Sequence, residues 1–148
     1  RGDPAAAAEG VAELGGCLGA LGERRLLLFP EADARLQGLQ IQLQRELEPA
    51  LVQAVAARDA EATRALVRQF GALGASARAE ACYVQCRQGP LYETWNRTAH
   101  AEGVAASGAL TAFWAYVGDG AAAERAWAAS VFPSGGALAS AVYSQARQ

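Results

Sequence analysis

The sequence predicts an all-α fold, in which several antiparallel helices form an elongated helical bundle or rod. Alanine is abundant, in runs such as Ala5 to Ala8 and Ala121 to Ala123, and it is the best helix former and a poor strand former. Only 7% of the residues are aromatic, and Ile41 is the single isoleucine, so residue types that strands favour are few. Apolar residues recur at steps of three and four, which is the spacing of one helix face.

The clearest helical pattern lies between residues 36 and 73. One apolar set consists of Leu36, Leu39, Leu43, Leu47, Leu51 and Val55, and a second of Ala62, Leu66, Phe70 and Leu73. Polar residues such as Gln40, Arg45 and Arg64 occupy the opposite sides. We therefore expect a pair of helices that each pack one side against neighbours.

We expect the first helix to begin at Asp3-Pro4, where Asp can cap the chain and Pro fits the first turn, and to stop at Gly22. A central helix from Glu31 to Glu48 follows, and Pro49 is expected to kink or break it. Ala50 to Ala57 resumes the same apolar pattern.

Asp59 is expected to cap the next helix, which ends near Leu73-Gly74. Ser76 opens another helix that Gly89 stops, and Pro90 restarts the chain. The last segments run from Val104, with an interruption at Gly118-Asp119-Gly120, to Pro133, and then from Ser134. All five prolines are thereby placed at helix boundaries.

Charge and cysteine content exclude several classes of function. All 13 basic residues are arginines spread along the chain and the net charge is -2, so no nucleic-acid interface is expected. Cys82 and Cys86 lie four residues apart, but His100 is distant and no second cysteine pair completes a metal site. We expect these two cysteines to be small core residues, and we expect no metal and no cofactor.

No residue pattern indicates catalysis. His100 lacks a serine or cysteine in a nucleophile context, and Gly118-Asp119-Gly120 lacks the pattern of a phosphate-binding loop. The uncharged run from Gly103 to Val117 is too short for a membrane span, so we expect a buried helix there. We predict a non-catalytic protein in a reducing, cytosolic environment.

The length of the chain and its first residue indicate how the domain is organised. The 148 residues are of single-domain size. Because the chain begins at Arg1 and contains no Met, we interpret residues 1–148 as a single helical segment of a longer protein, some of whose apolar surface belongs to missing neighbours.

The order of residues resembles subunit 7 of the conserved oligomeric Golgi complex. The likeness runs through LQIQLQRELEPALVQAVAARD (Leu39 to Asp59), RALVRQF (Arg64 to Phe70), ACYVQCRQGPLYETW (Ala81 to Trp95) and LTAFWAYVGDGAAAERAWAASVFP (Leu110 to Pro133). It covers the chain from about Ala12 to Phe132. The family is more continuously helical at Gly89-Pro90 and at Gly118-Asp119-Gly120.

The resemblance implies the N-terminal to middle region of a rod-like tethering subunit. Such subunits belong to an eight-member assembly on the cytosolic face of the Golgi membrane, to which they attach peripherally. The assembly captures vesicles in retrograde intra-Golgi transport and so supports Golgi organisation and protein glycosylation. Expected partners are subunits 5, 6 and 8 of the complex and, through the complex, SNAREs, Rab GTPases and coiled-coil tethers.

The largest apolar side chains are candidates for packing or subunit contact. We name the following set the predicted seam: Leu39, Leu43, Leu47, Leu51, Trp95, Phe113, Trp114 and Trp127. We expect the leucines to pack the central helix against the helix from Ala60 to Leu73 and against the helix that carries Phe113.

Two alternative functions remain open from the residues alone. One is a helical-rod subunit of another tethering complex, such as exocyst, which shares this composition. The other is a membrane-surface-binding helical module that uses the uncharged run from Gly103 to Gly118, although basic residues are absent from that run.

Overall fold

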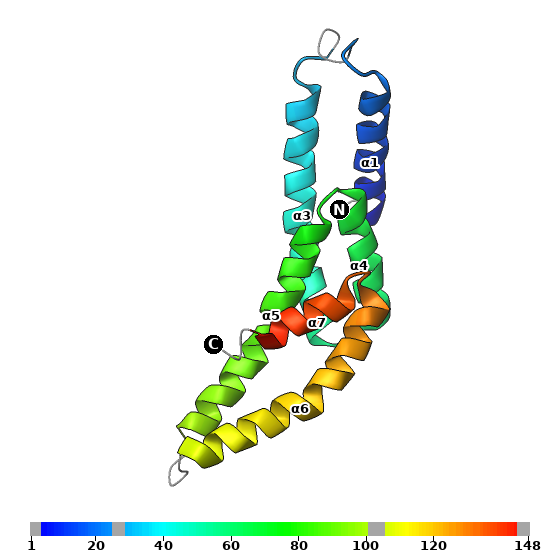
Figure 1. The fold of residues 1–148 in the computed structure, drawn as a ribbon. Helices are drawn as coiled ribbons and strands as arrows, with labels where there is room; N and C mark the ends of the chain where they lie inside the picture. Colours follow the sequence, from blue (N-terminus) through cyan, green and yellow to red (C-terminus); the bar gives the residue numbers. More distant parts are fainter. Residues whose placement is uncertain (1–3, 25–28, 101–105, 145–148) are drawn as a thin grey trace.

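A computed structural model describes residues 4–24, 29–100 and 106–144 of the protein (Figure 1). These residues are 88% helical and contain no strand, which confirms the predicted all-α class. The helices are α1 (Pro4–Ala20), α3 (Ala32–Ala56), α4 (Ala60–Ala72), α5 (Ser76–Ala99), α6 (Ala106–Val131) and α7 (Gly135–Ser144).

The helices form an elongated arrangement with three levels (Figure 1). At one end α1 and α3 lie side by side as a hairpin, and at the other end α5 and α6 converge. Between them α4 and α7 pack on α5 and α6, and α3 reaches down to contact α4 and α5. The middle level therefore brings together segments from most of the chain.

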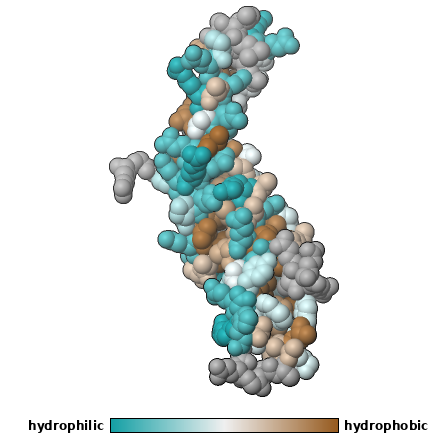
Figure 2. Space-filling model, turned by 90° about the vertical axis from the view of Figure 1, so that its left-hand side faces the viewer, coloured by the Kyte–Doolittle hydropathy of each residue, from teal (hydrophilic) through white to brown (hydrophobic). Residues whose placement is uncertain are grey.

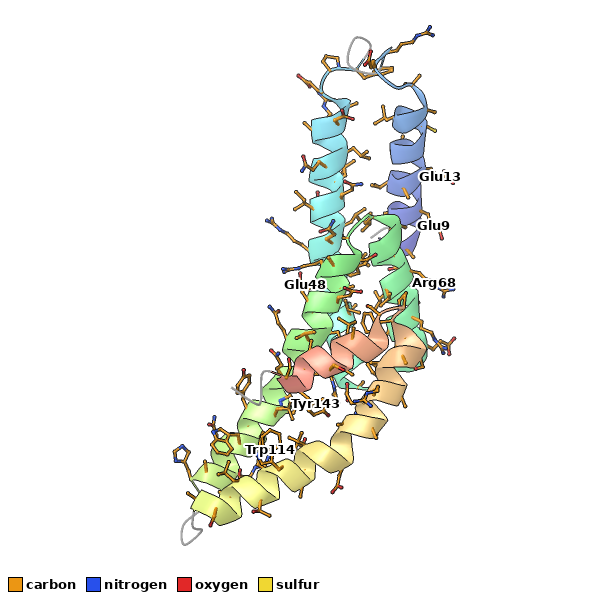
Figure 3. All side chains as sticks on the ribbon, viewed as in Figure 1. Glu9, Glu13, Glu48, Arg68, Trp114 and Tyr143 are labelled. Atoms are coloured by element: carbon orange, nitrogen blue, oxygen red, sulfur yellow. The ribbon has the colours of Figure 1, made fainter. Side chains whose placement is uncertain are left out.

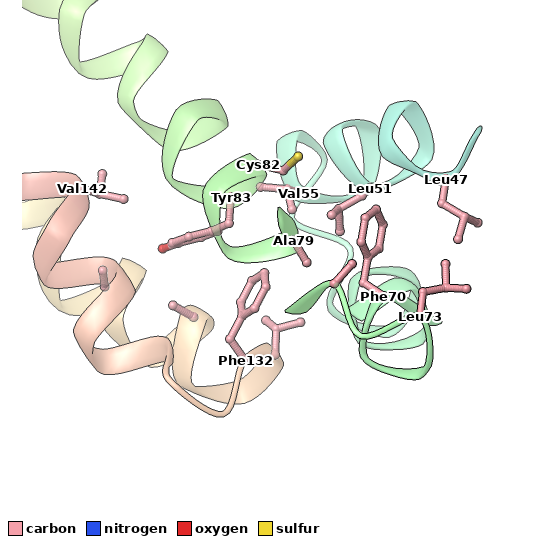
Figure 4. Packing of buried hydrophobic residues seen from close by; sticks show 14 of the residues in the cluster. Leu47, Leu51, Val55, Phe70, Leu73, Ala79, Cys82, Tyr83, Phe132 and Val142 are labelled. Carbon is pink, nitrogen blue, oxygen red and sulfur yellow. The ribbon is translucent and has the colours of Figure 1, made fainter. Parts of the chain in front are cut away.

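The hydrophobic core lies in this middle level (Figure 4). Leu51 and Val55 of α3 are fully buried there, as are Phe70 of α4 and Tyr83 of α5. Phe132 follows α6 and packs its ring 5.1 Å from the ring of Tyr83, measured between centroids. Tyr83 thereby connects the core of α3 and α4 to the α6–α7 corner.

Several helix ends agree with the sequence. Asp59 caps α4, since its carboxylate accepts hydrogen bonds from the amides of Glu61 at 3.1 Å and Ala62 at 3.0 Å. Gly74 adopts the left-handed conformation (φ 68°) after α4, a geometry that favours glycine. α5 begins at Ser76, as predicted.

Two predicted boundaries at prolines are wrong. Pro49 lies inside α3 and Pro90 lies inside α5, and both helices continue through them. Both prolines are exposed, whereas Leu47, Leu51 and Leu91 beside them are buried. Packing of these leucines holds each helix together despite the backbone hydrogen bond that each proline removes.

The predicted stops at Gly89 and at Gly118-Asp119-Gly120 are also wrong. Gly89 lies within α5, and the three residues lie within α6, which is visibly bowed in Figure 1. Val117 and Glu124 on either side of Gly118-Asp119-Gly120 are buried, so tertiary contacts hold the helix where local propensity is weak. The predicted starts at Asp3 and Val104 lie outside the described residues.

The corner between α6 and α7 depends on one glycine. A Cβ atom added to Gly135 would lie 2.1 Å from the carbonyl oxygen of Ala128. No side chain fits in that space, so glycine permits α7 to fold back directly onto α6.

Candidate functional site

A buried carboxylate joins three parts of the molecule. Glu124 of α6 is 1% exposed. Its Oε1 accepts hydrogen bonds from the Tyr83 hydroxyl (2.8 Å) and Arg87 Nε (2.9 Å), both on α5. Its Oε2 accepts from Arg87 Nη2 (2.7 Å) and from Nη2 of Arg58, which lies between α3 and α4. We call these four residues the Glu124 network.

The tight connection between α3 and α4 positions Arg58. The Asp59 amide donates to the Ala54 carbonyl at 3.0 Å, and Arg58 between the two helices has a φ of 56°. A left-handed residue other than glycine carries a conformational cost of about 1 kcal/mol. The Trp127 indole donates to the Arg58 carbonyl at 3.3 Å, so both the side chain and the backbone of Arg58 are bound to α6.

The electrostatics of the network favour the ionised carboxylate. Burial, the largest single influence, raises the pKa of Glu124, but hydrogen bonds from Arg87 and Tyr83 and the positive charge of Arg87 outweigh it. The net result is a pKa of Glu124 below its ordinary value. Burial and the hydrogen bond to Glu124 raise the pKa of Tyr83, so the phenol remains protonated.

The network is suited to holding helices together. Each carboxylate oxygen accepts two hydrogen bonds, which uses the acceptor capacity of the group. With the side chain buried, the geometry gives Glu124 no open face toward a substrate. It connects α6 to α5 and to the α3–α4 connection.

The Glu124 network was not predicted from the sequence, although the sequence contains one signal for it. Glu124 shares a helix face with Val117, Ala128 and Val131, which lie seven residues before and four and seven residues after it. An acidic residue in the middle of an apolar face requires a buried partner, but the sequence alone does not indicate which of the 13 arginines supplies it.

The structure distributes the predicted seam between two regions. Leu47 and Leu51 are buried in the middle level, Leu43 packs partly against them, and Leu39 is 46% exposed. Trp127 is half-buried and stacks on Tyr83, with 6.0 Å between ring centroids. The other members, Trp95, Phe113 and Trp114, lie toward the α5–α6 end.

The helix partners of α3 differ in part from those expected. α3 packs against α4, as predicted, and also against α1 and α5. The most extensive contacts of α6 are with α7, α5 and α4, and its expected packing against α3 is not among them. α3 meets the part of α5 that precedes Gly89, where Arg78 donates hydrogen bonds to Glu48 and the Cys86 sulfur lies 3.8 Å from the Val52 carbonyl oxygen.

Aromatic side chains gather where α5 and α6 converge. The Phe113 ring lies edge-on to Trp95 at 5.3 Å and to Trp114 at 5.6 Å, measured between centroids. Phe113 is buried, whereas Trp95 and Trp114 remain substantially exposed, as do the nearby Tyr92 and Tyr116. This end therefore presents aromatic surface to solvent.

A groove runs between α6 and α7, with a volume of about 430 Å³. Trp114, Val117 and Arg125 line it on α6, and Ala139 and Tyr143 line it on α7. Figure 3 shows Trp114 and Tyr143 approaching this region from the two helices. We call it the α6–α7 groove.

Exposed apolar residues also occur along the upper hairpin. Leu14 lies in α1 and Leu21 follows it directly. Leu39 and Ile41 lie in α3, and all four residues are exposed. In Figure 2, apolar patches interrupt the hydrophilic surface at several levels. Large apolar side chains without cover are thus present along the whole molecule.

Cys82 and Cys86 are placed for packing, whereas Cys17 is exposed. Cys82 is buried and Cys86 is half-buried, with its sulfur 3.8 Å from the Val52 carbonyl oxygen. Burial raises the pKa of both thiols. Among the described residues, no group of three histidine, cysteine or acidic side chains is arranged to hold a metal ion.

None of the described helices combines the length and apolar character that crossing a lipid bilayer requires.

No protein-family model, curated protein or solved structure matches the chain.

Proposed function

We propose that the protein is a non-catalytic subunit of the conserved oligomeric Golgi tethering complex, acting in retrograde vesicle transport within the Golgi. In this proposal residues 1–148 form one helical segment of a longer rod-like subunit. The subunit attaches peripherally to the cytosolic face of the Golgi membrane as part of the complex.

The observation that carries the proposal is the presence of exposed large apolar side chains at several levels of an elongated helical molecule. Leu14 and Leu39 near one end, and Trp95 and Trp114 toward the other, are all exposed large hydrophobics. Apolar surface of this kind marks sites of association with other proteins. A subunit of a multisubunit assembly requires such surface at several levels.

The resemblance to subunit 7 supplies the identity of the assembly. Its landmarks include Asp59, Phe70, the Tyr83–Cys86 pair and Trp127. Asp59 caps α4, Phe70 and Tyr83 form the core, and Trp127 binds the α3–α4 connection. The residues that carry the likeness are therefore residues on which this fold depends.

The proposal assigns subunits 5, 6 and 8 as direct neighbours. SNAREs, Rab GTPases and coiled-coil tethers are reached through the whole complex. Because tethering returns vesicles that carry glycosylation enzymes, loss of the protein should impair glycosylation without altering any enzyme directly.

The test is complementation with the full-length subunit in cells that lack subunit 7. We expect the tagged protein to co-purify with subunits 5, 6 and 8 and to restore cell-surface glycans measured by lectin binding. A Leu43→Ala variant, which alters the partly buried side of α3, should lower melting temperature and recovery together, whereas exposed Arg45→Ala should change neither. Co-purification with exocyst subunits instead would assign the protein to that complex.

A membrane-surface function is the second candidate, favoured by the exposed Trp95, Trp114 and Tyr116 at one end. Flotation of the purified protein with liposomes separates the two candidates. Binding to protein-free liposomes that Trp114→Ala abolishes would support the membrane function over the tethering one.

A further inference from the structure

We propose that the α6–α7 groove is the docking site for a helix of another subunit, which presents an apolar stripe to the groove and an acidic side chain to Arg125. The inference rests on the proposed function and names one surface through which the protein joins its assembly.

A continuous stripe on α6 leads into the groove. Leu110, Trp114, Val117, Ala121 and Arg125 follow one another at steps of three and four, so they lie along one side of the helix. Leu110 and Trp114 are 45% and 40% exposed, although both are large and apolar. α7 provides the second wall, with Tyr143 lining the groove. Two helices and a groove between them form a surface onto which a third helix can pack.

The middle of the groove is open to close approach. Gly118 is among its lining residues, and a Cβ atom added there would meet no heavy atom within 4 Å. Ala121 is the next lining residue on α6 and is also small. The backbone of an incoming helix can therefore come near α6 at this point, between Trp114 on one side and Arg125 on the other.

Charge specifies the chemistry of the occupant. Among the described residues, Arg125 is the one charged side chain that lines the groove, and it is exposed. It takes part in none of the ion pairs among the described residues, and adjacent Glu124 is buried and bound by Arg58 and Arg87. Asp119 lies on another side of α6. The groove wall is mixed, with apolar residues on α6 and with Ser140, Tyr143 and Ser144 on α7. A cation in such a groove is complemented by an acidic group on the partner.

The spacing makes the proposal specific. Trp114 and Arg125 are eleven residues apart in one helix, which corresponds to about 16 Å. A helix that lies along α6 should thus carry its acidic residue about three turns from the apolar residue that contacts Trp114.

Two other occupants fit less well. A helix that binds a membrane surface carries several basic residues on its polar face, whereas the described residues that line this groove include a single arginine. A symmetric contact with a second copy would place the same groove on both sides, and no acidic side chain is among the described lining residues to meet Arg125.

The experiment uses the full-length subunit and its purified neighbouring subunits. Gly118→Gln introduces a long side chain into the groove at a position where a Cβ atom meets nothing within 4 Å, and Arg125→Glu reverses the charge of the groove. We expect each to weaken binding of one neighbour by about tenfold or more. The matched control is Gly16→Gln in α1, where a Cβ atom also meets nothing within 4 Å, and which should bind as wild type. Circular dichroism and thermal melting should show all three folded.

A photo-crosslinking residue at Ala121 identifies the occupant. We expect crosslinks to one helix of that neighbour, and changing its acidic residue to Arg should restore most of the binding lost in Arg125→Glu. Crosslinks to a second copy or to lipid, or wild-type binding by both groove variants, would overturn the inference while leaving the proposed function standing. If the unmodified subunit binds no neighbour, both proposals fail.

Discussion

At the scale of single residues, Glu124 shows how a buried charge can fix the relation between distant helices. Removing one partner from a buried ion pair leaves the other charge uncompensated, which is far more costly than losing an exposed pair. Arg87 is only 17% exposed at the side chain, so it depends on Glu124 for compensation.

Glu124→Gln keeps the shape of the side chain and removes its charge. We expect it to lower the free energy of unfolding by about 3 kcal/mol, as measured by urea denaturation. The matched control is Glu31→Gln, which breaks an exposed pair with Arg35 and should cost less than about 0.5 kcal/mol. Equal effects of the two substitutions would show that the network adds no stability of its own.

The same network predicts how stability depends on pH. Because the pKa of Glu124 is lower in the folded protein than its ordinary value of 4.5, its contribution is present above pH 4.5 and is lost as pH falls through the folded value. The pKa of Tyr83 is raised above its ordinary value of 10.0, so its contribution is present below pH 10 and declines above it.

Melting temperatures measured from pH 3 to pH 8 test the predicted loss of stability in acid. We expect the wild-type protein to lose more stability than Glu124→Gln as the solution is acidified, since the variant has no carboxylate at this position to protonate. Parallel curves for the two proteins would contradict this interpretation.

At the scale of helices, the corner between α6 and α7 is the most restrictive feature. Gly135→Ala would drive a methyl group into the backbone of α6, 2.1 Å from the Ala128 carbonyl oxygen. The two helices must separate, and we expect a loss of about 3 kcal/mol or more, measured by thermal melting.

The neighbouring glycine supplies the control. Gly136 also lies in α7, but a Cβ atom added there meets nothing within 4 Å. Gly136→Ala should therefore be neutral or stabilise the protein by up to about 1 kcal/mol through helix propensity. A tolerated Gly135→Ala would require a wider corner than the structure has.

Helix starts and apolar faces could be predicted from the sequence, whereas helix continuity could not. Asp59 marks the start of α4 through a capping side chain, and α5 begins at Ser76 as predicted although Ala75 is its N-cap and no side chain caps it. Pro49 and Pro90 carry the local signal of a break, but buried leucines beside them are held by other helices. That stabilisation comes from residues far away in sequence, so no local pattern reports it.

The candidate surface was predicted only in part for the same reason. Trp114 was recognised by its size, but Gly118 and Arg125 acquire meaning only because α7 folds back beside them. The groove depends on the close approach of Gly135 to the backbone at Ala128. That approach cannot be predicted from the presence of a glycine in the sequence.

At the scale of the whole molecule, the elongated arrangement predicts uneven local stability. The middle level contains the fully buried Val55, Tyr83 and Ala128, while each end consists of two helices with exposed apolar side chains. In hydrogen exchange we expect the slowest amides around these three residues and faster exchange in the α1–α3 and α5–α6 ends. Uniform protection across all helices would show instead that the chain opens as one cooperative unit.

The Glu124 network also limits the order in which parts of the fold can be completed while the chain is synthesised on the ribosome. Arg58 precedes its carboxylate by 66 residues and Arg87 precedes it by 37, so both arginines are synthesised well before the group that neutralises them. The Arg58 carbonyl likewise gains its hydrogen bond only after the indole of Trp127 has been made, 69 residues later. The α1–α3 hairpin can pair as soon as it is made, and α3 can pack on α4 and α5 once these are made, but the α3–α4 connection can be joined to α6 only after Glu124 has been translated. Synonymous changes that slow or speed translation between these segments would then alter the yield of folded protein without altering a single amino acid.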